Sequence, residues 1–346
     1  MRRLTLAADQ FLVGEPDRRA NGIIAGYPWF GSWGRDTLIA LPGLCLTTGR
    51  WNEAREMLLG YARRMERGLL PNYVADDGAP VYTAADSALW LAEALAQYER
   101  TTGDTALVDT LLPTLSDIVA WYRRGPGHGI GVAADGLLAA GAPGLALTWM
   151  DARVGEWVVT PRRGKPVELQ ALWYNALRLV VGWRLARGQA CADLSEVAER
   201  CRLAFAERFW YAHGGYCFDV VDGERAAAML AAVERALLTP YGLRTLTPEH
   251  PAYRGRYGGD VPTRDGAYHQ GTVWPWLLEP YAVAARRVYG SGWLARPLLA
   301  RLAGHLGEGG LGSVSELFCG APPHEAGGAI AQAWSVAALL RLWLDV

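Results

Sequence analysis

The sequence lacks any marked excess of charge, any long apolar run and any closely spaced pair of cysteines. It has 34 Lys and Arg against 35 Asp and Glu, which gives a formal net charge of -1. A chain this close to neutral has no general electrostatic reason to bind nucleic acid or an anionic membrane, so neither is an expected partner. No segment approaches the roughly 20 apolar residues of a membrane span, and the first 14 residues lack a signal-peptide cleavage site. We therefore expect a cytoplasmic protein.

Other familiar motifs are absent as well. The five cysteines are scattered, and we expect buried free thiols and no metal site. His324 begins the stretch HEAGG, which resembles the start of a metalloprotease motif, but the second His is missing. Neither a phosphate-binding loop nor a nucleophile-elbow serine is present. No cofactor is expected.

Phenylalanine is scarce, whereas the other aromatic residues are abundant. Six Phe stand against 15 Trp and 15 Tyr. Trp and Tyr are favoured where an apolar face also meets a polar environment, and sugars, with apolar faces and polar rims, are ligands of this kind. Packing in a helical core is the alternative explanation, and it covers about half of these residues.

Helical periodicity dominates the chain, and the alternation typical of strands is nearly absent. Helices that are apolar on all sides alternate with helices that are apolar on one side, so inner and outer helices are expected to alternate. This order predicts one domain over residues 1–346, an all-α toroid of the α/α type, with long functional loops gathered at one end. The clearest expected helices are 37–50, 51–68, 84–103, 105–125, 166–188, 194–210, 271–290, 292–307 and 327–346, with an amphipathic helix within 1–14 and an outer helix from Glu224 onward.

Four carboxylates in or beside these loops are candidates for chemistry. Glycoside hydrolysis needs two carboxyl groups across the scissile bond, one protonated and one ionised. Asp151 and Glu316 lie in Gly-rich loops beside aromatic residues, where no long helix begins. Asp36 and Asp86 stand at expected helix starts, where capping of free N–H groups would also explain a carboxylate. Arg35 could form no more than a local ion pair with Asp36.

Five long motifs resemble the glucosidase domain of glycogen debranching enzymes. They are residues 25–50, 147–177, 239–260, 265–278 and 313–341. They occur in the same order as in the family, and the resemblance extends over nearly the whole chain. The resemblance implies an (α/α)6 barrel that hydrolyses α-1,6-linked glucose at branch stubs of a branched α-glucan. It also implies inversion of configuration and no cofactor.

The same resemblance assigns roles to individual residues. The Asp of the Thr-Trp-Met-Asp motif, Asp151, corresponds to the general acid, and the Glu of the Ser-Glu-Leu-Phe motif, Glu316, to the general base. The Trp-Gly-Arg-Asp motif implies that Arg35 and Asp36 hold the terminal glucose, with Trp33 as a wall. The other residues expected to bind substrate are Asp86, Trp149, Trp173, His269, Gln270, Trp274 and Trp334. For Trp173 and Trp334, which lie inside expected helices, core packing is an open alternative.

One segment departs from the family pattern. Family members usually insert an inner helix between tracts like the one ending at Gly223 and the one beginning at Glu224. Its absence predicts about eleven helices instead of twelve, with a gap in the inner ring. Two alternative functions follow: a glucan-binding protein that has lost catalysis, or a hydrolase of the same fold for another α-glucoside. The sequence does not indicate an oligomeric state.

Overall fold

The computed structural model describes residues 2–14, 22–74, 79–211, 216–217, 223–290 and 296–344. Most of these residues are helical, as the sequence predicts. The α-helices are α1 (Arg2–Phe11), α2 (Gly34–Leu41), α3 (Trp51–Arg63), α4 (Ser87–Thr102), α5 (Thr105–Arg124), α6 (Val167–Leu185), α7 (Ala192–Arg208), α8 (Gly223–Ala236), α9 (Val261–Gly266), α10 (Leu278–Tyr289), α11 (Arg296–His305) and α12 (Ala333–Leu344). Two short turns, η1 (Pro42–Leu46) and η2 (Pro275–Leu277), continue α2 and precede α10.

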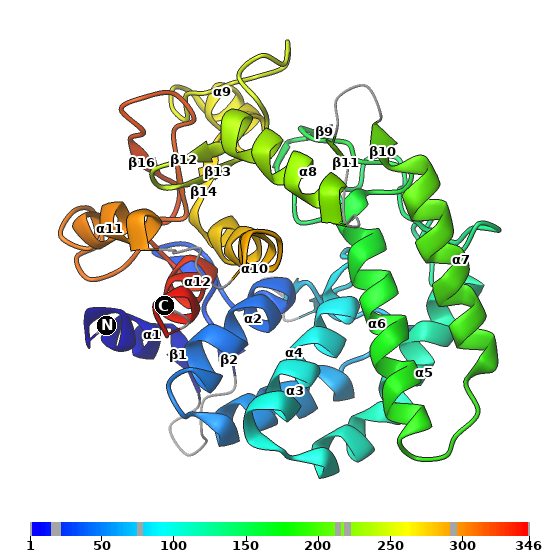
Figure 1. Cartoon of the computed structure of the whole chain (residues 1–346). Coiled ribbons are helices and arrows are strands. Elements are labelled where there is room, and N and C mark those ends of the chain that lie inside the picture. Colours follow the sequence, from blue (N-terminus) through cyan, green and yellow to red (C-terminus); the bar gives the residue numbers. More distant parts are fainter. Residues whose placement is uncertain are drawn as a thin grey trace.

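Five helices form an inner layer (Figure 1). α6 lies against α4, α4 against α2, α2 against α12 and α12 against α10. The clearest case is α12, in which every residue from Ala333 to Leu340 is buried. A helix that is apolar on all sides has no polar face to present to water, so it is stable only inside the fold.

The other long helices cover this layer from outside. α1 lies on α12, α3 on α4, α5 and α7 on α6, and α8 on α10. Each is buried along one stripe: in α3 the stripe includes Ala54, Met57, Leu58 and Tyr61. This spacing places four apolar side chains on one face of a helix with 3.6 residues per turn, and the charged residues of α3 on the other. The predicted alternation of inner and outer helices is therefore present.

The inner layer is open at one position. The described chain passes from α7 to α8 without an inner helix, and α6 and α10 do not pack on each other as the other inner neighbours do. Twelve α-helices are present in the described part of the chain, and eleven of them have eight residues or more; the sequence predicts about eleven. The segment that the sequence predicts to be short covers residues 214–240, and its residues 214–215 and 218–222 lie outside the described residues.

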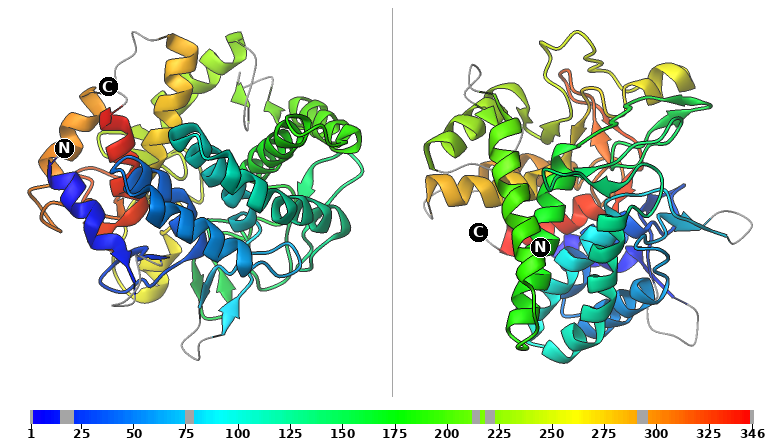
Figure 2. Two further views of the ribbon diagram at one scale, coloured as in Figure 1. Left: turned by 90° about the horizontal axis from the view of Figure 1, so that it is seen from below. Right: turned by 90° about the vertical axis from the view of Figure 1, so that its right-hand side faces the viewer.

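Most of the short strands gather at one end of the helical layers (Figure 2). All are two or three residues long. They are β1 (Leu12–Val13), β2 (Gly22–Ile23), β3 (Gly26–Tyr27), β4 (Tyr73–Val74), β5 (Pro80–Val81), β6 (Gly131–Val132), β7 (Leu138–Ala139), β8 (Arg153–Val154), β9 (Trp157–Val158), β10 (Trp210–Tyr211), β11 (Tyr216–Cys217), β12 (Leu238–Thr239), β13 (Gly242–Arg244), β14 (Val273–Trp274), β15 (Leu317–Phe318), β16 (Ala326–Gly327) and β17 (Ala331–Gln332). The prediction of almost no strands is wrong at this end, because a two-residue strand is too short to show alternation.

The largest sheet brings distant loops together. Its antiparallel order is β12-β13-β14-β15-β16. Val273 of β14 pairs with Phe318 of β15, and Leu317 pairs with Gly327 of β16. The loops that contain Tyr268 and Glu316 are thereby held side by side, although the sequence separates them by 48 residues.

The two ends of the described chain also meet. β17 pairs with β3, with Ala331 opposite Tyr27 and Gln332 opposite Gly26, and α1 lies on α12 (Figure 1). The segments just before α2 and just before α12 therefore lie next to each other. These segments contain several of the predicted site residues.

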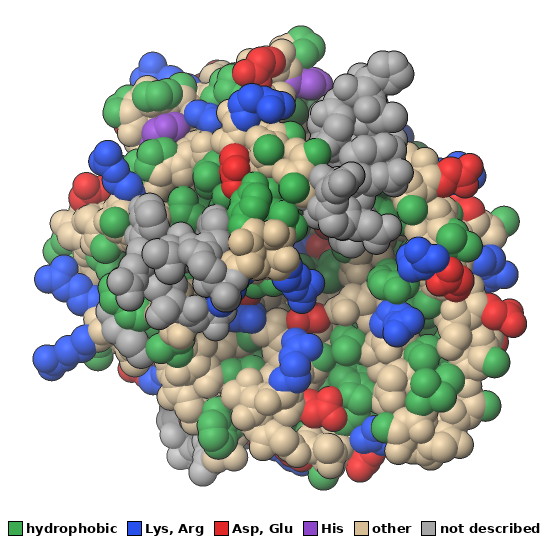
Figure 3. Space-filling view, in the orientation of Figure 1, with side chains coloured by type: hydrophobic (Ala, Val, Ile, Leu, Met, Phe, Trp, Pro, Cys, Tyr) green, Lys and Arg blue, Asp and Glu red, His purple; other side chains and the backbone are tan. Residues whose placement is uncertain are grey.

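The surface and the cysteines agree with the composition. On the face shown in Figure 3, Lys and Arg side chains are interspersed with Asp and Glu. Within the described residues, Cys45, Cys191, Cys201 and Cys319 are buried free thiols, as predicted. None of the helices described is both long enough and apolar enough to cross a membrane.

Candidate active site

The strand-rich end contains a cavity of about 560 Å³. This volume lies within the range of small-molecule sites, about 300–1,000 Å³. Nine of the twelve predicted site residues line it: Trp33, Arg35, Asp36, Trp149, Asp151, His269, Trp274, Glu316 and Trp334. The predicted convergence of distant loops on one site is therefore observed. Three predicted residues, Asp86, Trp173 and Gln270, do not line the cavity.

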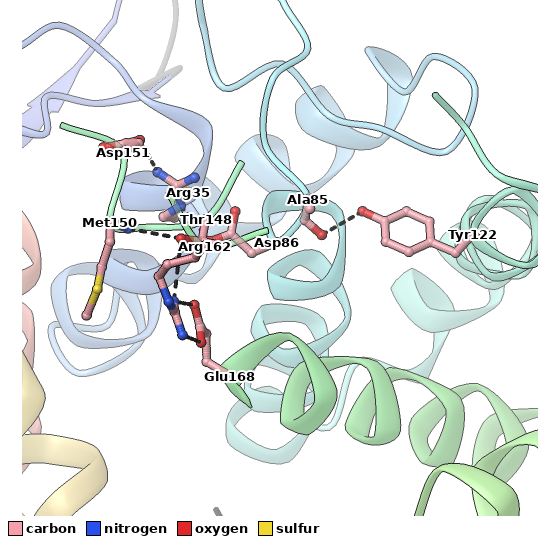
Figure 4. Close-up of polar contacts among 9 residues, drawn as sticks. All are labelled: Arg35, Ala85, Asp86, Tyr122, Thr148, Met150, Asp151, Arg162 and Glu168. Carbon is pink, nitrogen blue, oxygen red and sulfur yellow. Dashed lines mark hydrogen bonds and ion pairs between the residues drawn. The ribbon is translucent and has the colours of Figure 1, made fainter. Parts of the chain in front are cut away.

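Arg35 connects two carboxylates on one side of this cavity (Figure 4). Its Nε donates to Asp86 Oδ2 at 2.7 Å, and its Nη1 donates to Asp151 Oδ2 at 2.8 Å. Only 2% of Arg35 is exposed, and its Nη2 has no hydrogen-bond partner in the described structure. A buried guanidinium requires paired carboxylates, because leaving its charge uncompensated would cost several kcal/mol. Arg35 is thus held by Asp86 and in turn holds Asp151.

Helix capping does not account for Asp86, and Asp36 does not stand at an N-cap position. Asp86 stands at the N-cap position of α4, but its side chain makes no capping hydrogen bond and binds Arg35 instead. Asp36 lies in the first turn of α2, where the N-cap is Trp33 without a side-chain cap. The capping alternative is therefore wrong for Asp86. The ion pairs of Arg35 go to Asp86 and Asp151, so a local pair with Asp36 is not what holds it.

The loop that presents Asp151 is held by the start of α6. Arg162 forms a double hydrogen bond with Glu168 in the first turn of α6, and its Nη1 also approaches Thr148 Oγ1 at 3.5 Å. Thr148 Oγ1 accepts a hydrogen bond from the backbone N–H of Met150 at 3.3 Å (Figure 4). These contacts fix the three residues before Asp151. The carboxyl group can therefore keep a constant position although it lies in an irregular loop.

Burial raises the pKa of two carboxyl groups on this side. Desolvation raises the pKa of Asp151, and Arg35 opposes that effect. Desolvation raises the pKa of Asp36 to about 8, against the attraction of Arg35. Asp36 is therefore mainly protonated at neutral pH, and it can both donate and accept a hydrogen bond.

The contact between Asp36 and Gln332 fits a protonated Asp36. In the amide orientation that satisfies both ends of Gln332, its nitrogen donates to Ala25 O at 2.8 Å and its oxygen accepts from Trp334 Nε1 at 3.3 Å. The amide atom 3.5 Å from Asp36 Oδ1 is then an oxygen. Two oxygens 3.5 Å apart repel each other less when Asp36 carries a proton.

Glu316 lies on the other side of the cavity, directly before β15. The hydroxyl of Tyr268 donates a hydrogen bond to Glu316 Oε1. The backbone N–H of Ala329 donates to Oε2 at 2.8 Å, and Glu316 N donates to Ala329 O at 2.9 Å. Gly328 adopts a positive φ of 68°, and a Cβ at this position would collide with Glu316 Oε2. Only glycine leaves room for the carboxylate here.

The donors around Glu316 are neutral. Desolvation raises the pKa of Glu316 to about 7, while the hydrogen bonds from Tyr268 and Ala329 lower it and Asp151 raises it further. Burial raises the pKa of Tyr268 well above its usual value, so this side chain stays a hydroxyl donor. A carboxylate with a pKa near 7 is poised to accept a proton at neutral pH.

Aromatic rings line the cavity together with the two carboxyl groups. The His269 ring stacks on Trp274 at 5.1 Å, and Trp149 meets Trp274 edge-on at 5.5 Å. Trp334 contacts Trp274 at 5.7 Å and stacks on Trp276 at 5.2 Å. Burial lowers the pKa of His269 to about 3, so its imidazole is neutral. A dry aromatic wall of this kind explains why burial dominates the pKa of every carboxyl group that it faces.

Trp173 and Gln270 are placed elsewhere. Trp173 is fully buried, stacks on Tyr122 at 6.0 Å and donates to Gly136 O, so packing is its role. Gln270 donates to Thr160 Oγ1 at 2.9 Å and supports the loop behind the cavity wall. Cavity residues that the sequence analysis missed include Tyr268, Gln332 and Gly328. A Tyr directly before the predicted His269 was the one available signal.

No group of His, Cys, Asp and Glu that could hold a metal ion occurs in the part of the chain that the structure describes. His324 has a positive φ of 63°, and its Nδ1 lies 2.8 Å from Cys319 O in the loop after β15. Its ring therefore makes a contact within this loop.

Glycoside hydrolases are among the solved structures that share this fold. The chain superposes on a GH63 mannosylglycerate hydrolase from Thermus thermophilus with a TM-score of 0.72 and 16% identity, covering 99% of this chain and 100% of that chain. A rhamnosidase from Klebsiella oxytoca superposes with a TM-score of 0.56 and 14% identity, covering 98% of this chain and 62% of that one. The fold is thus one on which enzymes that cleave glycosidic bonds are built.

The sequence comparisons identify the family. The family model described as amylo-alpha-1,6-glucosidase matches residues 6–227 and 216–341, and the chain belongs to this family of glycoside hydrolases. The glycogen debranching enzyme of Saccharomyces cerevisiae is 24% identical over 469 residues. That alignment covers 96% of this chain and 30% of the yeast protein. The resemblance seen in the motifs is confirmed.

Proposed function

We propose that the chain hydrolyses α-1,6-glucosidic branch linkages in glycogen or limit dextrin, with inversion of configuration. Asp151 is the general acid and Glu316 the general base. The observation that carries this proposal is the pair itself: both carboxyl groups line one cavity, and burial raises the pKa of both. Membership of the amylo-alpha-1,6-glucosidase family supports the choice of linkage.

On the acid side, the protonated Asp151 donates to the glycosidic oxygen while the bond from this oxygen to C1 breaks. Arg35 occupies only Oδ2 of Asp151, which leaves Oδ1 for the transferred proton. Asp86 shares the positive charge of Arg35, and its own negative charge raises the pKa of Asp151. A substrate that displaces water from the cavity favours the protonated acid further.

On the base side, the ionised Glu316 accepts a proton from the water that attacks C1 from the opposite face of the sugar. An inverting mechanism needs room for this water, so we expect the two carboxyl groups to lie about 6.5–9.5 Å apart. Tyr268 and Ala329 orient the carboxylate without neutralising its charge. At the end of the step Asp151 is ionised, Glu316 is protonated, and a proton exchange with solvent restores the starting state.

Asp36 and Arg35 hold the terminal glucose. The neutral Asp36 offers both a donor and an acceptor to hydroxyl groups, and the unpartnered Nη2 of Arg35 offers a further donor. Trp33 and Trp149 supply apolar surface for the faces of the sugar. The residues that hold the glucose are thus different from those that transfer protons, although Arg35, which holds the glucose, also contacts the general acid Asp151.

We further propose that the two helical layers are an (α/α)6 toroid in which the inner helix between α6 and α10 is missing, and that the protein acts in the cytoplasm as a single domain. The family model matches in two segments that overlap at residues 216–227, the same place in the chain. A shortened segment between α7 and α8 accounts both for the missing inner helix and for the overlap of the two matched segments.

Glucose release from α-1,4, α-1,6 and α,α-1,1 substrates, with the anomer of the product recorded, tests the function. Release of β-glucose from isomaltose and branched dextrin is expected. Release of α-glucose would contradict the inverting mechanism. Activity confined to α-1,4 or α,α-1,1 linkages would contradict the proposed α-1,6 substrate.

A hydrolase for a different small α-glucoside is the second candidate. The observation that favours it is the superposition on the whole of a mannosylglycerate hydrolase chain. The same substrate panel, extended with glucosylglycerate and mannosylglycerate, distinguishes the two. Binding of branched dextrin without release of any sugar would instead indicate a glucan-binding protein without catalysis.

A further inference from the structure

The loop that leads to Glu316 is rich in glycine. It joins α11 to β15, and four of its residues between 307 and 312 are glycines. Glycine loses more conformational freedom on folding than any other residue, so such a loop needs contacts with the rest of the fold to keep one conformation. The hydrogen bonds from Tyr268 and Ala329 act on Glu316 itself. A different side chain binds the residue directly before it.

His305, the last residue of α11, binds this loop from behind the cavity. Its Nε2 lies 3.0 Å from Ser315 Oγ, and the backbone N–H of Ser315 donates to the same nitrogen at 3.3 Å. Its Nδ1 lies 3.1 Å from Glu308 Oε2. His305 and Ser315 are each only 2% exposed, and neither lines the catalytic cavity. Any effect of His305 on the reaction therefore passes through the loop.

The backbone of Ser315 determines which nitrogen of His305 carries the proton. A backbone N–H can only donate, so Nε2 is the acceptor and is unprotonated. Nδ1 then carries the proton and donates it in the hydrogen bond to Glu308. Both ring nitrogens are thus used, and the ring has one fixed orientation relative to the loop.

His305 also contacts the chain on the other side of Glu316. Its ring meets Phe318 edge-on, with 4.8 Å between the centroids, and Phe318 stacks on Tyr241 at 4.5 Å. Phe318 belongs to β15, where it pairs with Val273. His305 therefore contacts the residue just before Glu316 and the residue two positions after it.

We infer that His305 is a positioning residue for the general base. This inference rests on the proposed role of Glu316 in α-1,6 hydrolysis, and it adds a side chain outside the cavity on which kcat depends. A base must lie within hydrogen-bond reach of the attacking water, and a displacement of about 1 Å can lower the rate about 10²-fold. The contacts of His305 fix the backbone at Ser315, and Tyr268 then orients the carboxylate.

H305Q and H305N form a matched pair that tests this inference. Gln is one methylene longer than Asn, so its amide can occupy the place of Nε2 and accept from Ser315. The Asn amide reaches only the place of Nδ1, beside Glu308. The control is L302A, in which α11 loses a fully buried apolar side chain while the polar contacts of His305 are kept. Thermal unfolding shows up to which temperature each variant is folded, and kinetics are measured below it.

H305N is expected to lower kcat for isomaltose about tenfold to 10²-fold and to change KM less than about twofold, because it displaces the base and not the residues that bind glucose. H305Q is expected to keep kcat within about threefold of wild type. L302A is expected to lower the midpoint of thermal unfolding and to leave kcat unchanged.

Three kinetic outcomes overturn the inference. One is an equal kcat in H305N and wild type. Another is an equal loss in H305N and H305Q, since contact with Ser315 would then not matter. The third is a loss in L302A as large as that in H305N, because the packing of α11 would then explain both.

Two further measurements do not depend on catalysis. Nitrogen NMR of wild type identifies the protonated ring nitrogen of His305: a proton on Nδ1 is expected, and a proton on Nε2 overturns the inference. Amide hydrogen exchange over residues 313–319 is expected to be faster in H305N than in H305Q and wild type, because the loop loses its contact at Ser315. Equal exchange rates in H305N and wild type also overturn it.

The exchange measurement separates this inference from the proposed function. If wild type hydrolyses no α-1,6 glucoside while exchange over residues 313–319 rises in H305N alone, the proposed activity fails and the positioning of the Glu316 segment by His305 stands. If isomaltose is hydrolysed while kcat and exchange are the same in H305N and H305Q, the activity stands and the inference fails.

Discussion

The two sides of the catalytic cavity stabilise a buried carboxyl group in different ways. On the side of α2, Asp151 contacts a full positive charge, Arg35, which a second carboxylate, Asp86, partly balances. On the side of the sheet, Glu316 contacts only neutral donors, Tyr268 and a backbone N–H. A balanced charge allows one carboxyl group to be protonated while it is tightly held, and neutral donors allow the other to be ionised without a fixed counter-ion.

Removing the catalytic carboxyl group on either side of the cavity is expected to have the largest effect. In D151N the leaving oxygen loses its proton donor, and in E316Q the water loses its base. Each change should lower kcat at least about 10²–10⁴-fold, while calorimetry should show branched dextrin bound nearly as in wild type. Substantial turnover in both variants would contradict the assignment of Asp151 as general acid and Glu316 as general base.

A methyl group at position 328 tests the sheet side through its geometry. In G328A the new Cβ collides with Glu316 Oε2 and requires an unfavourable positive φ. Displacing the base by a fraction of an ångström to 1 Å should lower kcat by about 10²-fold, with a smaller effect on KM. G144A is a suitable control, because Gly144 also has a positive φ but has open space around its Cβ position. Equal losses in both variants would mean that backbone strain, and not the base, is responsible.

Y268F tests the neutral donor to Glu316. The hydrogen bond from Tyr268 lowers the pKa of Glu316, so its loss should raise that pKa above about 7. The base is active when ionised, and the acid limb of kcat/KM against pH should therefore move to higher pH. A decrease of about tenfold in kcat/KM at pH 7 is expected. An unmoved acid limb would show that Tyr268 does not control the base.

D86N tests the balanced charge on the other side and should move the opposite limb. The charge of Asp86 raises the pKa of Asp151, and without it Arg35 attracts Asp151 unopposed. The pKa of the acid should fall, and the alkaline limb of kcat/KM should move to lower pH by less than about one pH unit. D193N, which removes an exposed partner of Arg123, serves as the control without a shift. A shift of the acid limb in D86N would contradict the division between the two sides.

How much of this site could be predicted depends on where each residue stands relative to an inner helix. Arg35 and Asp36 lie in the first turn of α2, and Trp334 lies in the first turn of α12. Trp173 lies six residues beyond the start of α6, about 9 Å deeper along the helix axis, and packs in the core. Periodicity shows that both tryptophans face inward, but it does not show where along the axis the cavity ends.

The helices were predictable because their apolar patterns are long, whereas the sheet was not. The expected helix over 271–290 begins at Leu278, after β14 and η2, and the expected helix over 327–346 begins at Ala333, after β17. Pairing of these short strands is decided by contacts far away in the sequence, as between Val273 and Phe318. The partner of Glu316 could not be predicted for the same reason, since Tyr268 reaches it only through this sheet.

The pairing of β3 with β17 has a consequence for synthesis of the chain. Asp36 and Gln332, which meet in the cavity, are separated by 296 residues. At about 5–20 residues per second, a ribosome needs about 15–60 s to make the second after the first. During this interval the exposed Trp29 and the neighbouring Trp33 have no cavity to line, so a nascent chain presents these rings to chaperones or to other chains. Slow translation over the last third of the chain would prolong that exposure, and a chain released before β17 would have no active site.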